Sequence, residues 1–588
     1  MKLSNIKYMA VVAVASFSLM SCDDFLDRPN EDGYNNGNYY KTDDQFLASV
    51  NYLYNSPWYD FQRGFIKVGE VLSGNYYWGS SPYLNFSVNG SDEDLVNMSY
   101  SLWAVIGHAN TVYETLKGVS SNSAAKSQAM GECLTWKAMA YFYLVRSFGD
   151  VPIVHSNLQM LNNGTYTNVV KTKRSDVYEY IIMTLEEAMT LLQKSAAAGR
   201  IDYYAAEGLL AKVYLTKAGV TGSLNADDLN KAATLAKDVI DNSGRELTEN
   251  YGDIWKLTQN TAPESLIAWR WTVGSQWTSQ NTLQSDLGIE GIDEFGDCWG
   301  GWNGLSVDIQ EAFGIKLLEA GSADQWLSHP DTRLKATMML PGFVYDYMWQ
   351  DKGGFDYLKF IYDKSYNGAA TGTLQSATGA NCTKHLYGNN ADHVAALGIS
   401  AARMAYALAT HILRLSDIYL IYAEAKLGTS RATSTAADVL DAFYAVHHRA
   451  VPTADYPTSV SWDDIWKERR LEFAMEGDRW YDFVRVSYYD PQFCVDQLRN
   501  QKRNSFWGLD DAYKAYQSSG SWKIDLSKQG YDGTTSAPNV TVLLRRDSEV
   551  SNQGYFALPM AAEDVLFNGN LGSNVEGQHV DIRNTYSY

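Results

Sequence analysis

The sequence predicts a mainly α fold, in which a tetratricopeptide-like helical scaffold joins a large, irregular, loop-rich half. Apolar residues recur at helical spacing over about 42–241 and again over 403–485. The pair of segments 205–215 and 232–237 has a small-residue spacing typical of helix pairs that pack closely. Residues 250–400 are dominated by Trp, Gly, Asn, Asp and Ser, and contain too many tryptophans for a disordered segment. We therefore expect an irregular insertion between two helical parts.

The helices of the first part have lengths normal for globular proteins and short links, which favour antiparallel neighbours. Thr42-x-x-Gln45 is a capping-box pattern that marks the start of the first helix. Gly149 and Pro152 end the helix that contains Trp136. The expected helices of this part are 43–54, 95–117, 132–148, 175–193, 203–218 and 228–241.

Helical patterning returns after the insertion, at 403–427, 435–449 and 462–485. Gly428 ends the first of these helices, and Ser461-x-x-Asp464 is a second capping box that opens the third. Residues 486–588 are mixed and loop-rich. Residues 42–588 are thus expected to form one unit whose helices from both ends enclose the irregular middle.

The amino terminus has the features of an export segment. Lys2 and Lys7 precede an uncharged, mostly apolar stretch at 8–20, which is too short to span a bilayer as a helix. Ser21-Cys22 at its end resembles a bacterial lipoprotein signal, which implies that 1–21 is a signal peptide, that Cys22 is acylated, for example with palmitate, and that 22–41 is a lipidated tether. An ordinary signal peptide with an unrelated cysteine is the alternative. Asp23-Asp24 resembles the surface-export signal of Bacteroidetes lipoproteins.

Composition excludes several classes of protein. The 588 residues include 48 Lys and Arg against 68 Asp and Glu, a net charge of -20, so we expect no nucleic-acid partner. The sequence has no C-x-x-C pair, no H-E-x-x-H and no phosphate-binding glycine loop. We therefore expect no metal and no cofactor.

Two glycine-bounded aromatic clusters are the candidate ligand-binding sites. Exposed aromatic faces stack on the apolar face of a sugar ring, and neighbouring amides and carboxylates bind its hydroxyls. Glycines on both sides are expected to leave the rings and backbone open to a ligand. The candidates are Asn75, Tyr76, Tyr77 and Trp78 in the first cluster, and Asp297, Cys298, Trp299, Trp302 and Asn303 in the second.

Four blocks together resemble the SusD/RagB family of outer-membrane nutrient-binding lipoproteins of Bacteroidetes. The second is LRLSDIYLIYAEA at 413–425, and the third, ERRLEFAMEGDRWYD at 468–482, is similar to the family's Glu-Gly-x-Arg-Trp pattern. Asp478 stands where glutamine or lysine is common, and the usual terminal Gln-Asn-Pro-Gly-Tyr is replaced by Asn584-Thr585-Tyr586-Ser587-Tyr588. The other two blocks are WKAMAYFYLVRSFGDVP at 136–152 and FALPM at 556–560.

The resemblance implies a SusD-like fold in which the irregular half carries the ligand site and the helical half contacts a partner. It implies a lipid-anchored protein exposed on the cell outer membrane, which captures oligosaccharides or polysaccharides for a SusC-like TonB-dependent transporter. It implies no catalysis.

Two alternatives stay open at this stage. A glycoside hydrolase on a helical scaffold needs only two carboxylates brought close in space, and the many acidic residues do not exclude it. A structural lid for the transporter or a peptide binder is the other. The charges between Glu468 and Asp482 are interpreted as structural, because Glu468 and Glu472 share a helical face and the neighbouring arginines can pair with carboxylates from other helices.

Overall fold

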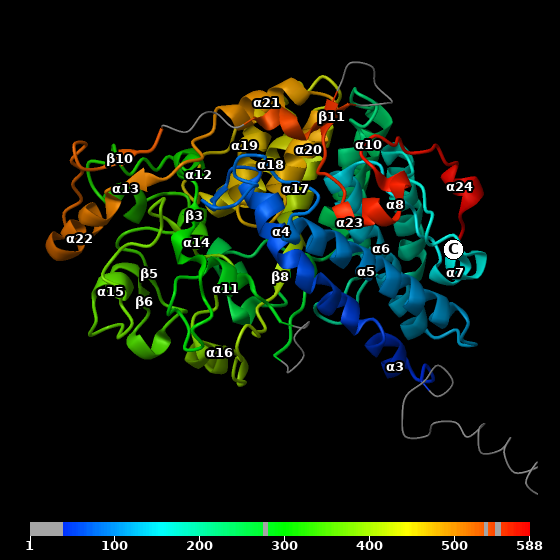
Figure 1. Ribbon diagram of the computed structural model, residues 1–588, viewed down its shortest axis with the longest axis horizontal. Coiled ribbons are helices and arrows are strands. Elements are labelled where there is room, and N and C mark those ends of the chain that lie inside the picture. The colour runs from blue at the N-terminus through cyan, green and yellow to red at the C-terminus, as the bar shows by residue number, and fades with distance from the viewer. Residues whose placement is uncertain (1–38, 274–279, 534–538, 547–553) are drawn as a thin grey trace, which may run out of the picture.

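The computed structural model describes residues 39–273, 280–533, 539–546 and 554–588. The fold is mainly α, as predicted. Figure 1 shows long helices on the right and a loop-rich half with short helices on the left. Cys22 and the expected signal peptide lie outside the described residues.

The long helices pack on one another in chain order. Helix α5 packs on α6, α6 on α8, α8 on α9 and α9 on α10, and α10 then contacts α17 from the other end of the chain. Every residue of α6 from Gln128 to Phe148 is buried, so this helix lies at the centre of the scaffold. The bounds are α5 (Glu93–Lys117), α6 (Ala124–Phe148), α8 (Arg174–Leu191), α9 (Tyr203–Lys217), α10 (Ala226–Asn242), α17 (Leu415–Lys426), α18 (Ala437–Ala450), α19 (Trp462–Glu472) and α20 (Arg479–Ser487).

Both predicted capping boxes are confirmed. Thr42 caps α3 (Asp43–Ala48), and Ser461 caps α19, and the backbone N–H of each cap residue donates in return to the side chain three residues on. Helix α3 is shorter than predicted, because the chain turns into a 3-10 helix, η1 (Asn51–Tyr54). The predicted start of the helix at 403–427 is also wrong, because 410–414 forms strand β8 and α17 follows it.

The predicted helix at 462–485 is two helices. The chain leaves α19 and re-enters α20 through Met475 and Gly477, whose φ angles are +67° and +74°. These left-handed conformations cannot continue a right-handed helix. A Cβ atom on Gly477 would lie 2.2 Å from the ring of Phe65. The glycine therefore also allows this loop to pack closely against Phe65.

The stretch 56–71 was not predicted to be helical. It forms a 3-10 helix η2 (Ser56–Phe61), a short α4 (Gln62–Ile66) and a π-helical turn η3 (Lys67–Val71). Most residues there are buried on more than one face of the helical turns, which obscures the helical period. Other helices missed from sequence are α7 (Asn157–Asn163), α21 (Pro491–Arg499), α22 (Leu509–Ser519) and α23 (Ala562–Phe567).

The irregular half contains short elements. Its strands form two-stranded antiparallel sheets, of which β2 (Ser265–Trp269) with β8 (Thr410–Arg414) is the longest. Strands β1 (Tyr76–Tyr77) and β3 (Gly304–Leu305) form another of these sheets. The short helices include α11 (Leu283–Leu287), α12 (Val307–Ala312), α15 (Tyr357–Tyr362) and α16 (Asn390–Leu397).

One large hydrophobic core runs through both halves. The ring of Trp58 lies 5.4 Å from that of Trp136 in α6 and 5.2 Å from that of Trp269 in β2, so aromatic packing connects the scaffold to the irregular half. The four described cysteines are buried and unbridged. No helix in the described part of the chain is long and apolar enough to cross a membrane.

Candidate functional site

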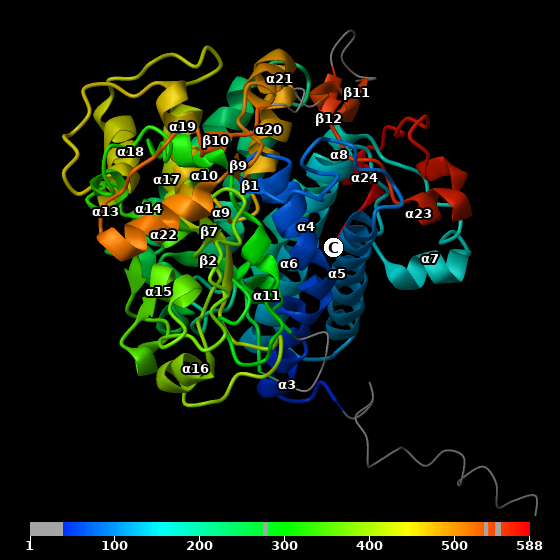
Figure 2. The same cartoon turned by 60° about the vertical axis from the view of Figure 1, so that its left-hand side comes forward.

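The two aromatic clusters predicted from sequence lie side by side. Tyr76 pairs with Leu305 and Tyr77 with Gly304 in the β1–β3 sheet. The backbone N–H of Ser306 donates to the carbonyl of Asn75 at 2.9 Å, and extends the contact by one residue. The sheet joins segments more than 200 residues apart in sequence, and Figures 1 and 2 place β3 and β1 near the middle of the molecule.

Four aromatic side chains of these clusters reach solvent. Trp302 is 62% exposed and Trp299 is 38% exposed. Tyr77 and Trp78 are half-buried, with part of each side chain accessible. We call Tyr77, Trp78, Trp299 and Trp302 the aromatic surface. Exposed tryptophans in one region are uncommon on a soluble protein and favour a binding role.

A series of polar contacts runs from Trp299 toward Trp78. The indole N–H of Trp299 donates to Asp286 Oδ1 at 2.8 Å, and the Nε of Arg63 lies 3.4 Å from the same oxygen. Burial raises the pKa of Asp286, and the adjacent Arg63 and the indole N–H act in the opposite direction. The carboxylate thus fixes both the indole and the guanidinium.

The series continues on α4 and η3. Arg63 Nη1 lies 3.8 Å from Asp94 Oδ1, and Lys67 pairs with the other oxygen of Asp94. The ammonium of Lys67 then lies 4.7 Å from the ring centroid of Trp78, a cation–π contact. Arg63 and Lys67 are one helical turn apart, and the Arg63 side chain is nearly half exposed beside the aromatic surface. Sequence reasoning missed both residues, because no helix was expected at 62–71.

The structure buries two candidates of the first cluster. Asn75 is fully buried, donates to Glu70 Oε2 at 2.9 Å and accepts from Arg470 Nε at 2.9 Å. Its amide is therefore used within the fold and is not available to a ligand. Tyr76 is also fully buried, because alternate residues of a strand point to opposite faces and its neighbour Tyr77 points outward.

The structure also buries three candidates of the second cluster. Asp297 and Cys298 are buried beside Asp293, and Asn303 is also buried, with its backbone carbonyl accepting from Asn381 Nδ2 at 3.3 Å. All three side chains are therefore largely withdrawn from solvent. Of the nine candidates, the accessible ones are the four of the aromatic surface.

The expectation that the glycines open the backbone to a ligand is wrong. A Cβ atom on Gly301 would lie 2.0 Å from Gln375 Oε1, and one on Gly300 would lie 2.3 Å from the carbonyl of Asp286. These glycines are needed because the backbone of the loop packs tightly on the residues beneath it. Close packing of the loop leaves the rings of Trp299 and Trp302 facing outward.

Asp293, Asp297 and Cys298 offer three ligand atoms within 4.8 Å of one another. Burial, together with the neighbouring carboxylate of Asp293, raises the pKa of Asp297 to about 6. Burial and the same carboxylate also raise the pKa of the Cys298 thiol, whose Sγ lies 3.2 Å from Asp293 Oδ2. The Cys298 thiol donates to the Asp293 carboxylate, so these groups are linked to one another within the fold.

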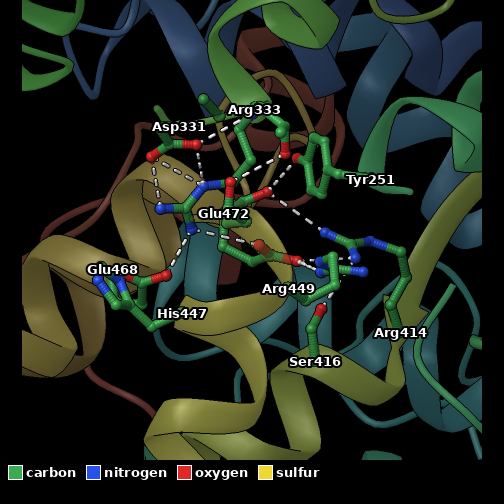
Figure 3. A network of polar contacts seen from close by, with 12 residues as sticks. Tyr251, Asp331, Arg333, Arg414, Ser416, His447, Arg449, Glu468 and Glu472 are labelled. Atoms are coloured by element: carbon green, nitrogen blue, oxygen red, sulfur yellow. Dashed lines mark hydrogen bonds and ion pairs between the residues drawn. The ribbon is translucent and has the colours of Figure 1, made fainter. Parts of the chain in front are cut away.

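The charged block at 468–482 forms a buried ion-pair network, as predicted (Figure 3). Arg333 contacts Glu468 at 2.6 Å and Glu472 at 3.3 Å, while Arg414 and Arg449 reach the other oxygen of Glu472 at 3.0 and 2.5 Å. All of these side chains are almost fully buried.

The arginines of this network keep its glutamates ionised, as expected for carboxylates in structural ion pairs. Burial alone would raise the pKa of Glu472, but Arg449, Arg414 and Arg333 lower it to about 2. Arg333 likewise lowers the pKa of Glu468 against the effect of burial. A general acid needs a raised pKa and access to substrate, and these two carboxylates have neither.

Comparisons with known proteins agree on one family. A model described as "SusD family" matches residues 324–576, and a model described as "Starch-binding associating with outer membrane" matches 43–215. A SusD-like protein of Bacteroides ovatus is 30% identical over 579 residues, which cover 95% of this chain and 96% of that protein.

Solved structures give the same result. A structure determined with xylogluco-oligosaccharide superimposes with a TM-score of 0.73 and is 27% identical, covering 91% of this chain and 99% of that one. A laminarin-binding SusD-like protein has the same fold, with a TM-score of 0.61, 20% identity and coverage of 90% and 98%.

Proposed function

The chain belongs to the SusD family, and from this premise we propose that it is a carbohydrate-binding protein of the outer membrane surface. In this proposal, oligosaccharides are captured on the aromatic surface and passed to a partner TonB-dependent transporter. The protein binds its ligand without cleaving it.

The aromatic surface is the observation that carries the proposal. Exposed indole faces provide apolar area for the faces of sugar rings, and their edges and neighbours provide hydrogen-bonding groups. The exposed part of Arg63 lies beside Trp299 and offers N–H donors for hydroxyl oxygens. Stacking on several rings suits an extended oligosaccharide better than a single monosaccharide.

A first choice of ligand follows from the relatives. The structural neighbour determined with xylogluco-oligosaccharide is 27% identical over nearly the whole chain. Xylogluco-oligosaccharide is therefore the first probe for this protein. Aromatic stacking recognises ring faces generally, so oligosaccharides with other linkages serve as the comparison set.

Isothermal titration calorimetry tests capture, and chromatography of the same oligosaccharide after incubation tests catalysis. We expect saturable binding and an unchanged chain length. The double substitution Trp78→Ala/Trp299→Ala should weaken binding by more than about fivefold, whereas Trp507→Ala, which removes an exposed tryptophan of β9 (Phe506–Trp507), should leave it unchanged. Time-dependent shortening of the oligosaccharide would identify a hydrolase and end the proposal of pure capture.

Attachment to the membrane is proposed to occur through acylated Cys22, because the sequence before it resembles a lipoprotein signal. Replacing Cys22 by serine should release the protein from the membrane fraction and prevent labelling with a palmitate analogue. Retention of the variant in the membrane fraction would contradict lipid anchoring.

The transporter partner is tested by co-purification of the tagged, membrane-anchored protein. We expect a TonB-dependent transporter to be recovered in equal amount by the parent protein and by the Trp78→Ala/Trp299→Ala variant. Recovery of no transporter with either protein would contradict the partnership and leave glycan capture standing.

A further inference from the structure

A second surface of the molecule has the character of a protein-docking site. A groove of about 730 Å³ lies between α5, α7 and α23, and most of the side chains that line it are apolar. Figure 2 shows α7 and α23 at the edge of the helical half, away from β1 and α11. No residue of the aromatic surface lines this groove.

The helices on both sides of the groove have no buried residue. Phe567 is 85% exposed and Leu566 is 82% exposed on α23, and Leu161 on α7 is 62% exposed. Short helices whose apolar side chains remain in water gain little from hydrophobic burial in the free protein. Contiguous exposed apolar area of this kind marks an interaction site.

Polar contacts hold the walls of the groove, together with the packing of Val565 from α23 on the hydrophobic core. Asn157 at the start of α7 donates to the carbonyl of Gly107 in α5 at 2.7 Å. Asn568, directly after α23, donates to the carbonyl of Val169 at 2.7 Å. The groove is therefore formed before any partner arrives, which reduces the entropy cost of binding.

The charge inside the groove indicates the chemistry of the partner. The side chain of Asp564 lines the groove and is half-buried, and burial followed by the adjacent carboxylate of Glu563 raises its pKa. Among the described residues, no side chain or N–H group forms an ion pair or hydrogen bond with this carboxylate. An acidic group in an apolar groove favours a basic side chain from the partner and disfavours an anionic lipid surface.

We propose that the groove between α7 and α23 docks another protein by receiving an apolar segment that carries a lysine or arginine, with the basic group paired to Asp564. The inference rests on the proposed function in one respect, namely that this protein works with a protein partner. Glycan capture uses none of the residues of the groove.

Fluorescence anisotropy with three labelled peptides tests the proposal on the full mature protein. The peptides consist of Leu, Phe and Ala and differ at one central position, which is Arg, Leu or Glu. We expect the Arg peptide to bind about tenfold more tightly than the Glu peptide. Asp564→Asn should remove most of this difference, and Phe567→Ser should weaken the binding of all three peptides.

Leu526→Ser is the matched control, because Leu526 is also highly exposed but lies in the turn after α22. It should bind the peptides as the parent does. Titration of xylogluco-oligosaccharide should be unchanged in all three variants, which separates a failure of this inference from a failure of glycan capture.

Three results would overturn the proposal. The first is equal affinity of the parent for the Arg and Glu peptides, or binding of none. The second is binding to vesicles of phosphatidylglycerol that Phe567→Ser abolishes, which would assign the groove to a membrane. The third is loss of oligosaccharide binding in Phe567→Ser, which would assign it to glycan.

Discussion

Replacing Trp302 by alanine measures how much one exposed ring contributes to sugar binding. Trp302 is 62% exposed, which corresponds to about 120 Å² of the roughly 200 Å² that a tryptophan can bury. A sugar ring covers one face, or about 60 Å². At about 25 cal/mol per Å² this amounts to about 1.5 kcal/mol, and the dissociation constant should rise about tenfold.

Trp299 provides an internal comparison. Its 38% exposure corresponds to about 40 Å² of accessible area on one face of the ring. Covering that area contributes about 1 kcal/mol of binding free energy, so Trp299→Ala should lose about fivefold in affinity. Isothermal titration calorimetry with xylogluco-oligosaccharide should therefore rank Trp302→Ala as the weaker binder. Differential scanning calorimetry should show a nearly unchanged Tm for Trp302→Ala, because its ring is mostly in water.

Equal weakening of binding in Trp507→Ala and Trp302→Ala would refute the role of the aromatic surface, since both variants remove an exposed indole and only Trp302 lies on that surface. Parent-like binding by Trp302→Ala would refute it as well. A reversed ranking of Trp299 and Trp302 would refute the use of exposed area as the measure of stacking.

Glu472→Gln should lower the free energy of unfolding at pH 7 by about 3 kcal/mol, because the pKa of Glu472 falls from its ordinary 4.5 to about 2 on folding. This stabilisation is complete above pH 4.5 and is lost toward pH 2. The free energies of unfolding of parent and variant, measured by urea titration, should therefore converge in acid. A difference that stays constant with pH would contradict the lowered pKa of Glu472. Gly477→Ala should lower the free energy of unfolding, measured in urea, by about 3 kcal/mol, because the new Cβ atom meets the ring of Phe65. Gly398 has a similar φ but open space around it, so Gly398→Ala should lower it by about 1 kcal/mol. Equal losses in the two variants would show that the contact with Phe65 is unimportant. Asp286→Ala should weaken oligosaccharide binding about fivefold in calorimetry by freeing the indole that it holds, and unchanged affinity would remove its positioning role.

Helical periodicity predicted most of the scaffold, because long helices with one buried face carry a clear signal. It missed 56–71, where most residues are buried and the helical period is obscured. It also joined α19 to α20, although Gly477 lies inside the expected helix. That glycine was the available signal, since a φ of +74° is a conformation that glycine adopts readily and other residues rarely.

The candidate site was predictable as two clusters, but its accessible members were not. Tyr76 and Tyr77 are adjacent and chemically alike, yet one is fully buried and the other partly exposed. Which of them faces solvent depends on the register of β1 against β3, and Gly304 is more than 200 residues away in sequence. A pairing of this kind leaves no local pattern. Arg63 was not predicted as a site residue for a related reason. It is connected to Trp299 through Asp286, and this contact exists only in the folded chain.

The charged block at 468–482 is connected to the aromatic surface through the first cluster. Arg470 donates to the amide oxygen of Asn75 at 2.9 Å, and the backbone N–H of Gly477 donates to Glu70 Oε1 at 2.7 Å. The other oxygen of Glu70 accepts from Asn75, directly before β1. Burial raises the pKa of Glu70 to about 7, a cost that these hydrogen bonds partly offset.

These contacts give the acids and bases of the block a structural role. Glu468 and Glu472 are paired with buried arginines, and Arg470 fixes the backbone that precedes Tyr77 and Trp78. Stacking on a sugar needs rings whose positions are set before the ligand arrives. The buried Asn75, unavailable to a ligand, is therefore best understood as the residue through which the ion-paired scaffold positions the aromatic surface.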